Sequence, residues 1–367
     1  MIKRLGEIAS FQRGLTYSKG DETVSSSKKV LRSNNIDSAS SSLDLSEIKY
    51  LREDFVIPQD RKLKANTIFI CMSNGSKQHV GKVAFIEKDM DFAFGGFMGL
   101  IIPSSEVSAK YVFYACQSSA YRTFLSQIGN GIGITNLRFS DLEKFEFPLP
   151  SFPEQQHIVA ELDFLSGIIE KKNAQLKTLD EFAQSIFYEM FGDPRENELN
   201  WKSKAFKDVF KLKSGDGLKE KDFIPGKYPV FGGNGISGYH NAYNKNGEHI
   251  IIGRVGAYCG NVRYVNNDFW LTDNAFDAFF NTSEFDYQFV SWLLNILDLH
   301  RFANHAAQPV ISNTGLRELS IIIPPIGLQT DFANKISAIE HTKKLVTASL
   351  ETTKQLLNSR MDKYFNV

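Results

Sequence analysis

The chain contains one structural unit twice, and this internal repeat constrains its fold more than any other feature. The segment GITNLRFSDL at Gly133–Leu142 matches VISNTGLREL at Val310–Leu319. Two fainter matches lie upstream in the same order: Leu5–Gly14 with Phe206–Gly215, and Val80–Phe85 with Cys259–Tyr264. Matching pieces in matching order predict two similar domains, each with its own core.

A long helix is predicted after each copy. Phe147–Gln156 reads FPLPSFPEQQ, and Ile323–Thr330 reads IPPIGLQT. Prolines followed closely by Glu or Gln are typical of a helix start. We therefore expect helices over Glu154–Phe191 and Leu328–Tyr364.

Apolar residues recur along both helices in steps of three and four, the 3.5-residue period of coiled coils. In the first helix they are Leu162, Leu165, Ile169, Leu176, Leu179, Ala183, Ile186 and Met190, and only Lys172 interrupts them. In the second they are Ile336, Ile339, Val346, Leu350, Leu357 and Tyr364. Because both helices belong to one chain, each is the most accessible partner of the other. The alternative is that each packs only on its own domain, but a helix of roughly 50 Å is far longer than a typical globular helix.

These features divide the chain into four segments, at 1–150, 151–192, 193–323 and 324–367. Gly192, Asp193 and Pro194 end the first helix. The globular segments, the first and third, are expected to have an α/β (α+β) fold. Short strands are expected at Thr67–Met72, Lys82–Ile86 and Glu248–Ile252, and helices at Tyr111–Ile128 and Tyr287–Phe302.

Composition excludes several classes of protein. Hydrophobic residues make up 42% and charged residues 23% of the chain, and no segment approaches the roughly 20 apolar residues that span a bilayer. Met1–Leu5 lacks the features of a signal peptide, so we expect a cytoplasmic protein with no membrane partner. The net charge is +0, so the composition lacks the excess of Lys and Arg that is typical of many nucleic-acid-binding domains. Cys71, Cys116 and Cys259 lack paired spacing and are interpreted as packing residues.

No catalytic or metal-binding motif is present in the sequence. The glycine-rich stretches Gly129–Gly133 and Gly232–Gly238 lack the preceding strand and following helix of a phosphate loop, and are interpreted as turns. Asp193-Pro194 is followed by Arg195, whereas an adenine methyltransferase motif needs a second proline and an aromatic residue. His300 and His305 are spaced wrongly for a shared helical face. We therefore predict a non-catalytic chain without a metal.

Polar and aromatic residues gather in loops of both copies. Arg suits guanine edges, Asn and Gln suit adenine edges, and Lys suits phosphate. Taken singly, each residue is better explained as a solvated loop residue than as a DNA contact. As a set repeated in both copies, they are candidates for DNA contact: Arg32, Asn34, Asn35, Ser73, Asn74, Lys77, Gln78, Asn234, Tyr239, Asn244, Arg254, Tyr258 and Asn261.

The chain resembles type I restriction-modification specificity subunits over essentially its full length. The resemblance is carried by the repeat, by PLPSFPEQQHIVAEL and FYEMFGDP around the first helix, and by YPVFGGNGISGY, IIGRVGAYCGNV and AAQPVISNTGLRELSIIIPPI in the second copy. One departure is Gly327-Leu328-Gln329, where the family typically has a Glu-Gln pair. It predicts a looser start of the second helix.

The resemblance implies two tandem target recognition domains, each reading one half of a bipartite double-stranded DNA site. The long helices would form an antiparallel coiled coil that acts as a spacer and docks two modification subunits, with restriction subunits joining them. No cofactor is expected on this chain, because S-adenosylmethionine, ATP and Mg would be held by those partners. Two rival interpretations are a stand-alone methyltransferase or nuclease, and a coiled-coil scaffold that binds proteins without reading DNA.

Overall fold

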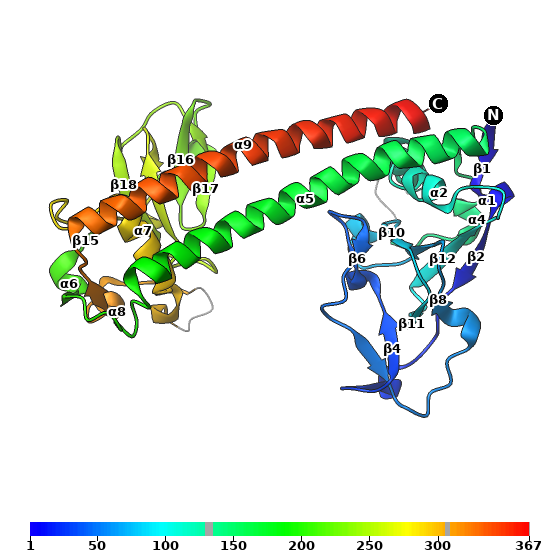
Figure 1. The fold of residues 1–367 in the computed structure, drawn as a ribbon, viewed down its shortest axis with the longest axis horizontal. Helices are drawn as coiled ribbons and strands as arrows, with labels where there is room; N and C mark the ends of the chain where they lie inside the picture. Colours follow the sequence, from blue (N-terminus) through cyan, green and yellow to red (C-terminus); the bar gives the residue numbers. More distant parts are fainter. Residues whose placement is uncertain (129–134, 305–308, 367) are drawn as a thin grey trace. The chain divides into compact units, whose positions relative to one another are not determined.

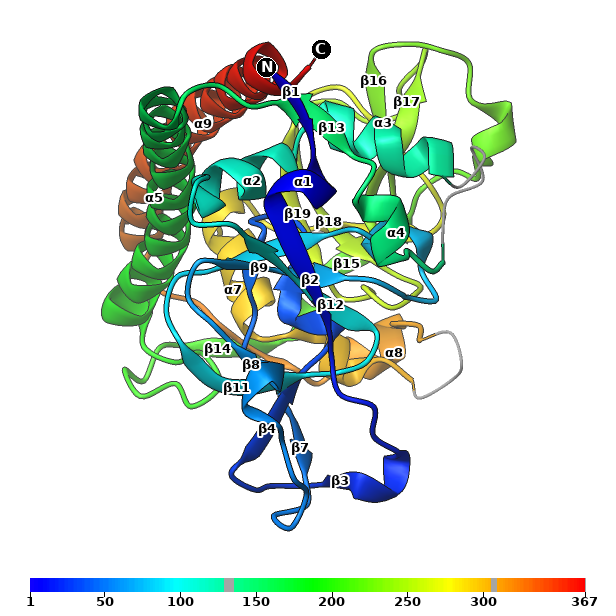
Figure 2. The same ribbon diagram turned by 90° about the vertical axis from the view of Figure 1, so that its right-hand side faces the viewer.

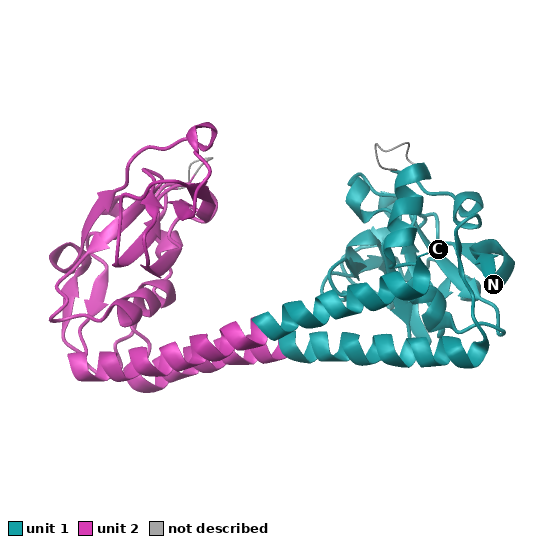
Figure 3. Ribbon diagram, turned by 90° about the horizontal axis from the view of Figure 1, so that it is seen from above, with its two compact units in different colours: residues 1–173, 348–367 teal, residues 174–347 magenta. Residues whose placement is uncertain are grey.

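The computed structural model describes residues 1–128, 135–304 and 309–366. The chain divides into two compact units, which Figure 3 colours separately: unit 1 is Met1–Asn173 with Ala348–Val367, and unit 2 is Ala174–Thr347. Each unit therefore contains one globular domain and a portion of both long helices, α5 (Phe152–Phe191) and α9 (Ile326–Phe365).

The globular part of unit 1 is built on an antiparallel sheet in the order β10-β9-β12-β2. A second sheet has the order β3-β7-β4-β11-β8, and β1 pairs with β13 and β5 with β6. The strands are β1 (Ile2–Arg4), β2 (Ala9–Arg13), β3 (Glu22–Thr23), β4 (Lys28–Leu31), β5 (Ile36–Asp37), β6 (Ser42–Leu43), β7 (Lys49–Leu51), β8 (Lys62–Leu63), β9 (Thr67–Cys71), β10 (Val83–Ile86), β11 (Met90–Phe94), β12 (Met98–Pro103) and β13 (Glu146–Pro148). The helices are α1 (Leu5–Ile8), α2 (Ala109–Ala115), α3 (Ser119–Ile128) and α4 (Phe139–Leu142), with short 3-10 turns η1 (Lys19–Asp21), η2 (Ser33–Asn35), η3 (Gln59–Arg61) and η4 (Lys77–His79).

Unit 2 repeats this plan with fewer strands. Its main sheet has the order β15-β21-β18-β19, its second sheet β17-β16-β20, and β14 pairs with β22. The strands are β14 (Ser203–Ala205), β15 (Lys211–Ser214), β16 (Tyr228–Gly232), β17 (Gly235–His240), β18 (Glu248–Gly253), β19 (Val262–Asn266), β20 (Trp270–Leu271), β21 (Ala275–Phe279) and β22 (Ser320–Ile322). The helices are α6 (Phe206–Val209), α7 (Tyr287–Ile296) and α8 (Asn313–Leu316), with η5 (Glu220–Asp222) and η6 (Leu299–Phe302).

The repeat found in the sequence corresponds to equivalent elements of the two units. The pairs β2 and β15, β10 and β19, and α4 and α8 come from the matched segments, and the main sheets share one strand order. Gly81 and Gly260 both have positive φ, at 84° and 92°, and both amides donate to the last residue of the preceding core strand. A side chain is strained in this left-handed region, so both copies require glycine at the same turn.

The α/β (α+β) fold and the two long helices are confirmed. The expected strands at Thr67–Met72, Lys82–Ile86 and Glu248–Ile252 correspond to β9, β10 and β18. The helix expected over Tyr111–Ile128 is instead two helices, α2 and α3, and the one over Tyr287–Phe302 is α7 followed by η6. All three cysteines are free and buried, and burial raises the pKa of Cys71 to about 11 and of Cys116 to about 12. Within the described residues, no helix is long and apolar enough to cross a membrane.

The long helices run antiparallel within each unit. In unit 1, Glu161 of α5 forms an ion pair with Arg360 at 2.8 Å and accepts a hydrogen bond from Tyr364 at 2.5 Å, while Lys172 donates to Ser349 at 2.6 Å. In unit 2, Lys343 of α9 pairs with Asp180 of α5 at 2.7 Å. Residue numbers that rise along α5 are paired with numbers that fall along α9, so the two helices are antiparallel. Lys172, which interrupts the apolar series, forms its hydrogen bond with the polar side chain of Ser349.

Side chains of both long helices also belong to the core of each globular domain, and the ribbons place α5 and α9 beside α2 in unit 1 and beside α7 in unit 2 (Figures 1 and 2). In unit 1 the ring of Phe365 lies 5.0 Å from that of Tyr111 in α2. In unit 2 the ring of Phe187 lies 5.9 Å from that of Phe289 in α7. The helix residues therefore pack both on each other and on the domains, which combines the two alternatives left open by the sequence.

The predicted helix-pairing residues differ in burial. Leu162, Leu165, Ile336, Ile339 and Leu350 are buried. The remainder are partly buried: Ile169, Leu176, Leu179, Val346 and Leu357. Leu357 belongs to the core of unit 1 with Leu162, and Leu179 to the core of unit 2 with Ile336 and Ile339.

The two helices, each 40 residues long, match position by position without a gap, from Phe152 with Ile326 to Phe191 with Phe365. This match places Gln329 at the position of Gln155. Gln155 accepts from the amide of Ser108 and donates to Pro150 O, at 2.9 Å each. Gln329 accepts from the amide of Asp286 at 3.0 Å and donates to Glu284 O and Pro324 O. The expected looser start of the second helix is therefore wrong, because its buried glutamine makes the same contacts.

Replacing either glutamine is expected to destabilise its unit strongly. Gln155→Ala and Gln329→Ala leave a buried amide N–H and buried carbonyls without partners, at a cost of about 1 to 3 kcal/mol for each such group. We expect each variant to lose about 2 to 4 kcal/mol of unfolding free energy, measured by denaturant titration. Gln156, the exposed neighbour of Gln155, gives the matched control: a Gln156→Ala variant as unstable as Gln155→Ala would contradict this account.

Candidate nucleic-acid interface

The main sheet of unit 1 brings several loops to one end. Because β2 and β9 both run antiparallel to β12, the ends of β2 and β9 meet the beginning of β12. An open cavity of ≈ 1180 Å³ lies at this end. Its lining comes from six stretches of chain: Arg13 and Leu15–Lys19 with Glu22, Arg32–Asn34, Glu47, Met72–Gly75, Gly95–Met98, and Thr135 with Asn136. We call it the strand-end cavity.

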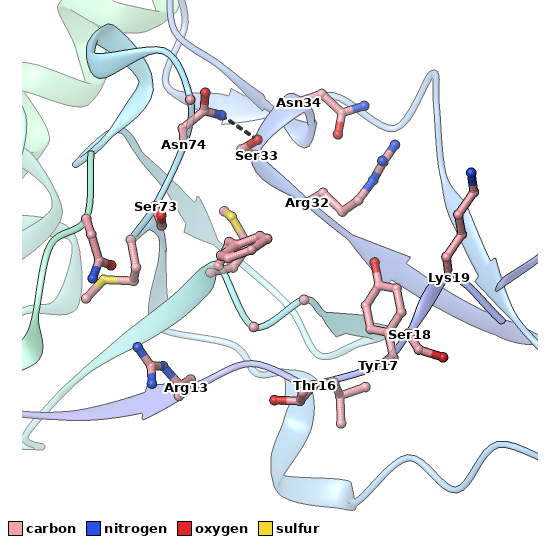
Figure 4. A pocket seen from close by; sticks show the side chains of 18 of the residues that line it. Arg13, Thr16, Tyr17, Ser18, Lys19, Arg32, Ser33, Asn34, Ser73 and Asn74 are labelled. Carbon is pink, nitrogen blue, oxygen red and sulfur yellow. Dashed lines mark hydrogen bonds between the residues drawn. The ribbon is translucent and has the colours of Figure 1, made fainter. Parts of the chain in front are cut away.

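The strand-end cavity is rich in hydrogen-bond donors. Figure 4 shows Asn74 bonded to Ser33 on one side, and Arg13, Tyr17 and Lys19 along the facing segment. Its two acidic residues are already paired, Glu47 with Arg32 at 3.1 Å and Glu22 with Lys49 at 2.7 Å. Arg13 and Lys19 are exposed and have no ion-pair partner among the described residues. Available positive charge at this edge suits a polyanion.

The structure separates the candidates of the first copy into three groups. Arg32, Asn34, Ser73 and Asn74 line the cavity. Lys77 and Gln78 are exposed on the neighbouring η4 turn but do not line it.

Asn35 differs from the other candidates because it is only 1% exposed. Its amide accepts from Arg32 N and donates to Asp44 O and Glu47 O. This side chain holds the loop and cannot reach a ligand, so a DNA-contacting role for Asn35 is wrong.

The corresponding edge of unit 2 carries a similar arrangement. The start of β21 meets the ends of β15 and β18, and Arg254 follows β18 there. Its guanidinium lies 3.5 Å from Ser214 Oγ, 3.4 Å from Asp273 O and 5.5 Å from the ring centroid of Phe276. Ser214 occupies the register position that Arg13 holds in unit 1. Each unit thus places a guanidinium group at the equivalent strand end. In unit 1 it belongs to Arg13 at the end of β2, and in unit 2 it belongs to Arg254, directly after β18.

The other candidates of the second copy come from different segments: Tyr258 and Asn261 from the connection after β18, Asn234 from the turn between β16 and β17, and Tyr239 from β17, opposite Pro229. Asn234, Tyr239, Tyr258 and Asn261 are exposed, and the two tyrosines are 54% and 56% accessible. Asn244 is half-buried: its amide donates to Asp216 and Leu271 O and accepts from Leu271 N. Asn244 is therefore mainly a loop-fixing residue.

One of the two glycine-rich stretches lies within the described residues. Within Gly232–Gly238, only Gly233 and Asn234 form the turn between β16 and β17, and Gly235, with φ of 106°, is the one glycine of the stretch with a positive φ, so the expected turn covers part of the stretch and the rest is strand. Gly129–Gly133 and His305 lie outside the described residues.

One buried ionic cluster lies in the main sheet of unit 2. Asp277, 1% exposed, accepts from Lys245 at 2.9 Å and lies 3.0 Å from His249 Nδ1. Burial alone would raise the pKa of Asp277, but the bonds from His249 and Lys245 outweigh it and lower that pKa. Among the residues that the structure describes, no group of three His, Cys, Asp or Glu side chains is placed to hold a metal.

Sequence reasoning missed several residues of the strand-end cavity, among them Arg13, Tyr17 and Lys19. Arg13 ends a strand whose repeat partner ends in Ser214, so the comparison of the two copies concealed it. Its position directly before a glycine at a strand end was the available signal.

Two equivalent units, each with a polar strand end and a share of paired helices, define a tandem recognition protein. The chain belongs to the family of the type I restriction modification DNA specificity domain, whose model matches residues 1–178 and 198–355. Each match covers one copy of the repeat.

Relatives and solved structures agree with this assignment. The specificity subunit of the Escherichia coli enzyme EcoprrI is 29% identical over 237 residues, which are 60% of this chain and 58% of that protein. The EcoKI specificity subunit of Escherichia coli K12 is 25% identical over 218 residues, 58% of this chain and 46% of that protein. The chain thus spans about half the length of these relatives. The S subunit from M. genitalium has a similar fold, with a TM-score of 0.63 and 18% identity over 100% of this chain and 96% of that one.

Proposed function

We propose that this chain is the DNA-reading specificity subunit of a type I restriction-modification complex, in which each unit reads one half of a bipartite double-stranded site. The observation that supports this most directly is the repetition of a donor-rich strand end. In unit 1, two guanidinium groups and several amide and aromatic side chains line the strand-end cavity, and in unit 2 the guanidinium of Arg254 lies where the equivalent strands end. Such side chains can read base edges, while lysines contact phosphates.

We further propose that the chain is non-catalytic and binds no cofactor. Its strand ends offer hydrogen-bond donors, but the candidate residues include no general base paired with a nucleophile. The methyl donor S-adenosylmethionine, and ATP with Mg, would then be held by modification and restriction subunits.

The long helices are proposed to dock two modification subunits, one for each copy of the repeat. Phe182 of α5 and Leu356 of α9 hold the same repeat position and are 53% and 45% exposed. Phe152 and Ile326 form a second such pair. Apolar residues exposed at equivalent positions fit two copies of one partner.

The test is an exchange of the first globular domain for that of a relative. Because β1 pairs with β13, with Ile2 opposite Pro148, the exchanged segment should run from Met1 to Pro150, so that the core of the unit stays intact. We expect the complex with its modification subunit to methylate a site changed in one half only, as mapped across a genome.

The matched control is exchange of the second domain, from Asp193 to Ile323, which should change the other half. Both halves changing together would contradict independent reading. A recognised sequence that stays unchanged after either exchange would support the protein-binding scaffold instead.

A further inference from the structure

Phe97 is an exposed aromatic residue at the mouth of the strand-end cavity. It is 72% exposed and follows Gly95 and Gly96 in the turn between β11 and β12. A single exposed apolar side chain is ordinary in a soluble protein, so exposure alone carries no argument. The place of Phe97, beside Arg13, Arg32 and the other donors of this cavity, is what requires explanation.

The backbone that carries the ring is held firmly. The carbonyl of Phe97 accepts from the amides of Met72 at 2.8 Å and Ser73 at 3.1 Å, and Met98 N donates to Gly95 O at 2.8 Å. Met72 and Met98 below it are buried. The turn therefore presents the ring from a fixed backbone without prior rearrangement, which lowers the entropic cost of a contact.

The chemistry of the cavity restricts what the ring can touch. An apolar protein partner would leave the surrounding guanidinium and amide groups without partners, at a cost. A duplex offers both kinds of surface, because the thymine C5-methyl is an apolar group among hydrogen-bonding base edges of the major groove. On the basis of the proposed function, we infer that Phe97 contacts the C5-methyl of a thymine in the half-site read by unit 1, and so helps to determine its specificity.

Unit 2 has a different side chain at the equivalent position. The carbonyl of Asn274 accepts from the amide of Arg254 at 2.9 Å, as that of Phe97 does from Met72, and Asn274 directly precedes β21 as Phe97 precedes β12. Asn is suited to hydrogen bonding with adenine rather than to a methyl contact. The two units would therefore read this position by different chemistry.

The test removes only the methyl group from the DNA. Once the site is mapped, duplexes carry deoxyuridine in place of each thymidine in turn, and kcat/KM for methylation by the reconstituted complex is measured on each. We expect one position in the half-site of unit 1 to lose about fourfold, the contribution of one buried methyl group. Phe97→Asn should abolish this difference between thymine and uracil, whereas Phe97→Leu, which keeps an apolar contact, should retain part of it.

Matched controls separate this inference from the function on which it rests. Val56, 83% exposed and outside the cavity lining, should be replaceable by Ala without altering the discrimination, and uracil in the other half-site should be read equally by wild type and Phe97→Asn. Site-specific methylation with no sensitivity to uracil, or with sensitivity that survives in Phe97→Asn, overturns the role of Phe97 alone. Failure of the complex to bind or methylate any specific site overturns the proposed function. A Phe97→Asn chain that no longer binds the modification subunit would assign the ring to a protein contact and also overturn the inference.

Discussion

A fragment of residues 1–191 is expected to form a homodimer that directs methylation of a symmetric site. Truncation removes α9, whose Met361 and Phe365 pack in the core of unit 1 with Ile158 and Leu162 of α5. The uncovered apolar surface is disfavoured in water. The end of α5 from a second copy can cover it, because the two helices match position by position.

The substituting residues preserve the apolar contacts well. In the second copy, Phe187 takes the position of Met361, Phe191 that of Phe365, and Leu176 that of Leu350. Phe191 can then meet Tyr111 as Phe365 does, at 5.0 Å between ring centroids. Lys172 would face Gln175, which replaces Ser349 and also offers an oxygen acceptor.

The polar contacts are weaker in such a dimer. Ile186 and Met190 replace Arg360 and Tyr364, so Glu161 loses both of its partners. Association also becomes bimolecular and costs several kcal/mol of translational and rotational freedom. We therefore expect dimerisation to depend on protein concentration.

The measurements are sedimentation of the purified fragment and methylation mapping after its co-expression with the modification subunit. An antiparallel pair of identical helices is twofold symmetric and should read a palindrome. Leu162→Asp should leave the fragment monomeric and inactive. A stable dimer that methylates an asymmetric site would refute the two-copy interpretation.

The sequence predicted the helices and the repeat because both depend on periodic patterns. A seam of apolar residues every 3.5 positions is visible without coordinates. The role of Gln329 does not follow from any period in the sequence. It is recognised only when the two helices are matched, because this match gives Gln329 the position of Gln155.

The site was less accessible to sequence reasoning because it depends on which side chain points outward. Asn34 and Asn35 are adjacent and chemically identical, yet Asn34 lines the strand-end cavity while Asn35 is buried and bonded to three backbone groups. Phe97 resembles a core residue between apolar strands, and only the fold of its glycine turn exposes it. The candidates chosen in both copies do include residues at equivalent strand ends, since Arg254 and the loops at Arg32 and Asn74 lie there.

Lengthening both helices by one heptad is expected to lengthen the gap between the half-sites while preserving the bases in each. Because Lys172 donates to Ser349, seven residues inserted after Lys172 and seven before Ser349 keep the contacts on both sides of the insertion. Seven residues are two turns of a coiled coil, so the apolar seam stays aligned. They add about 10 Å along the helices, roughly three base pairs of DNA. Three base pairs also turn the duplex by about 100°, so we expect slower methylation of the new site together with near loss of the original one.

Methylation mapping of the doubly lengthened complex gives the gap directly. The matched control, four residues inserted after Lys172 alone, leaves α9 too short to pair and should be inactive or unstable. An active doubly lengthened variant that still methylates only the original gap would show that the helices do not set the spacing.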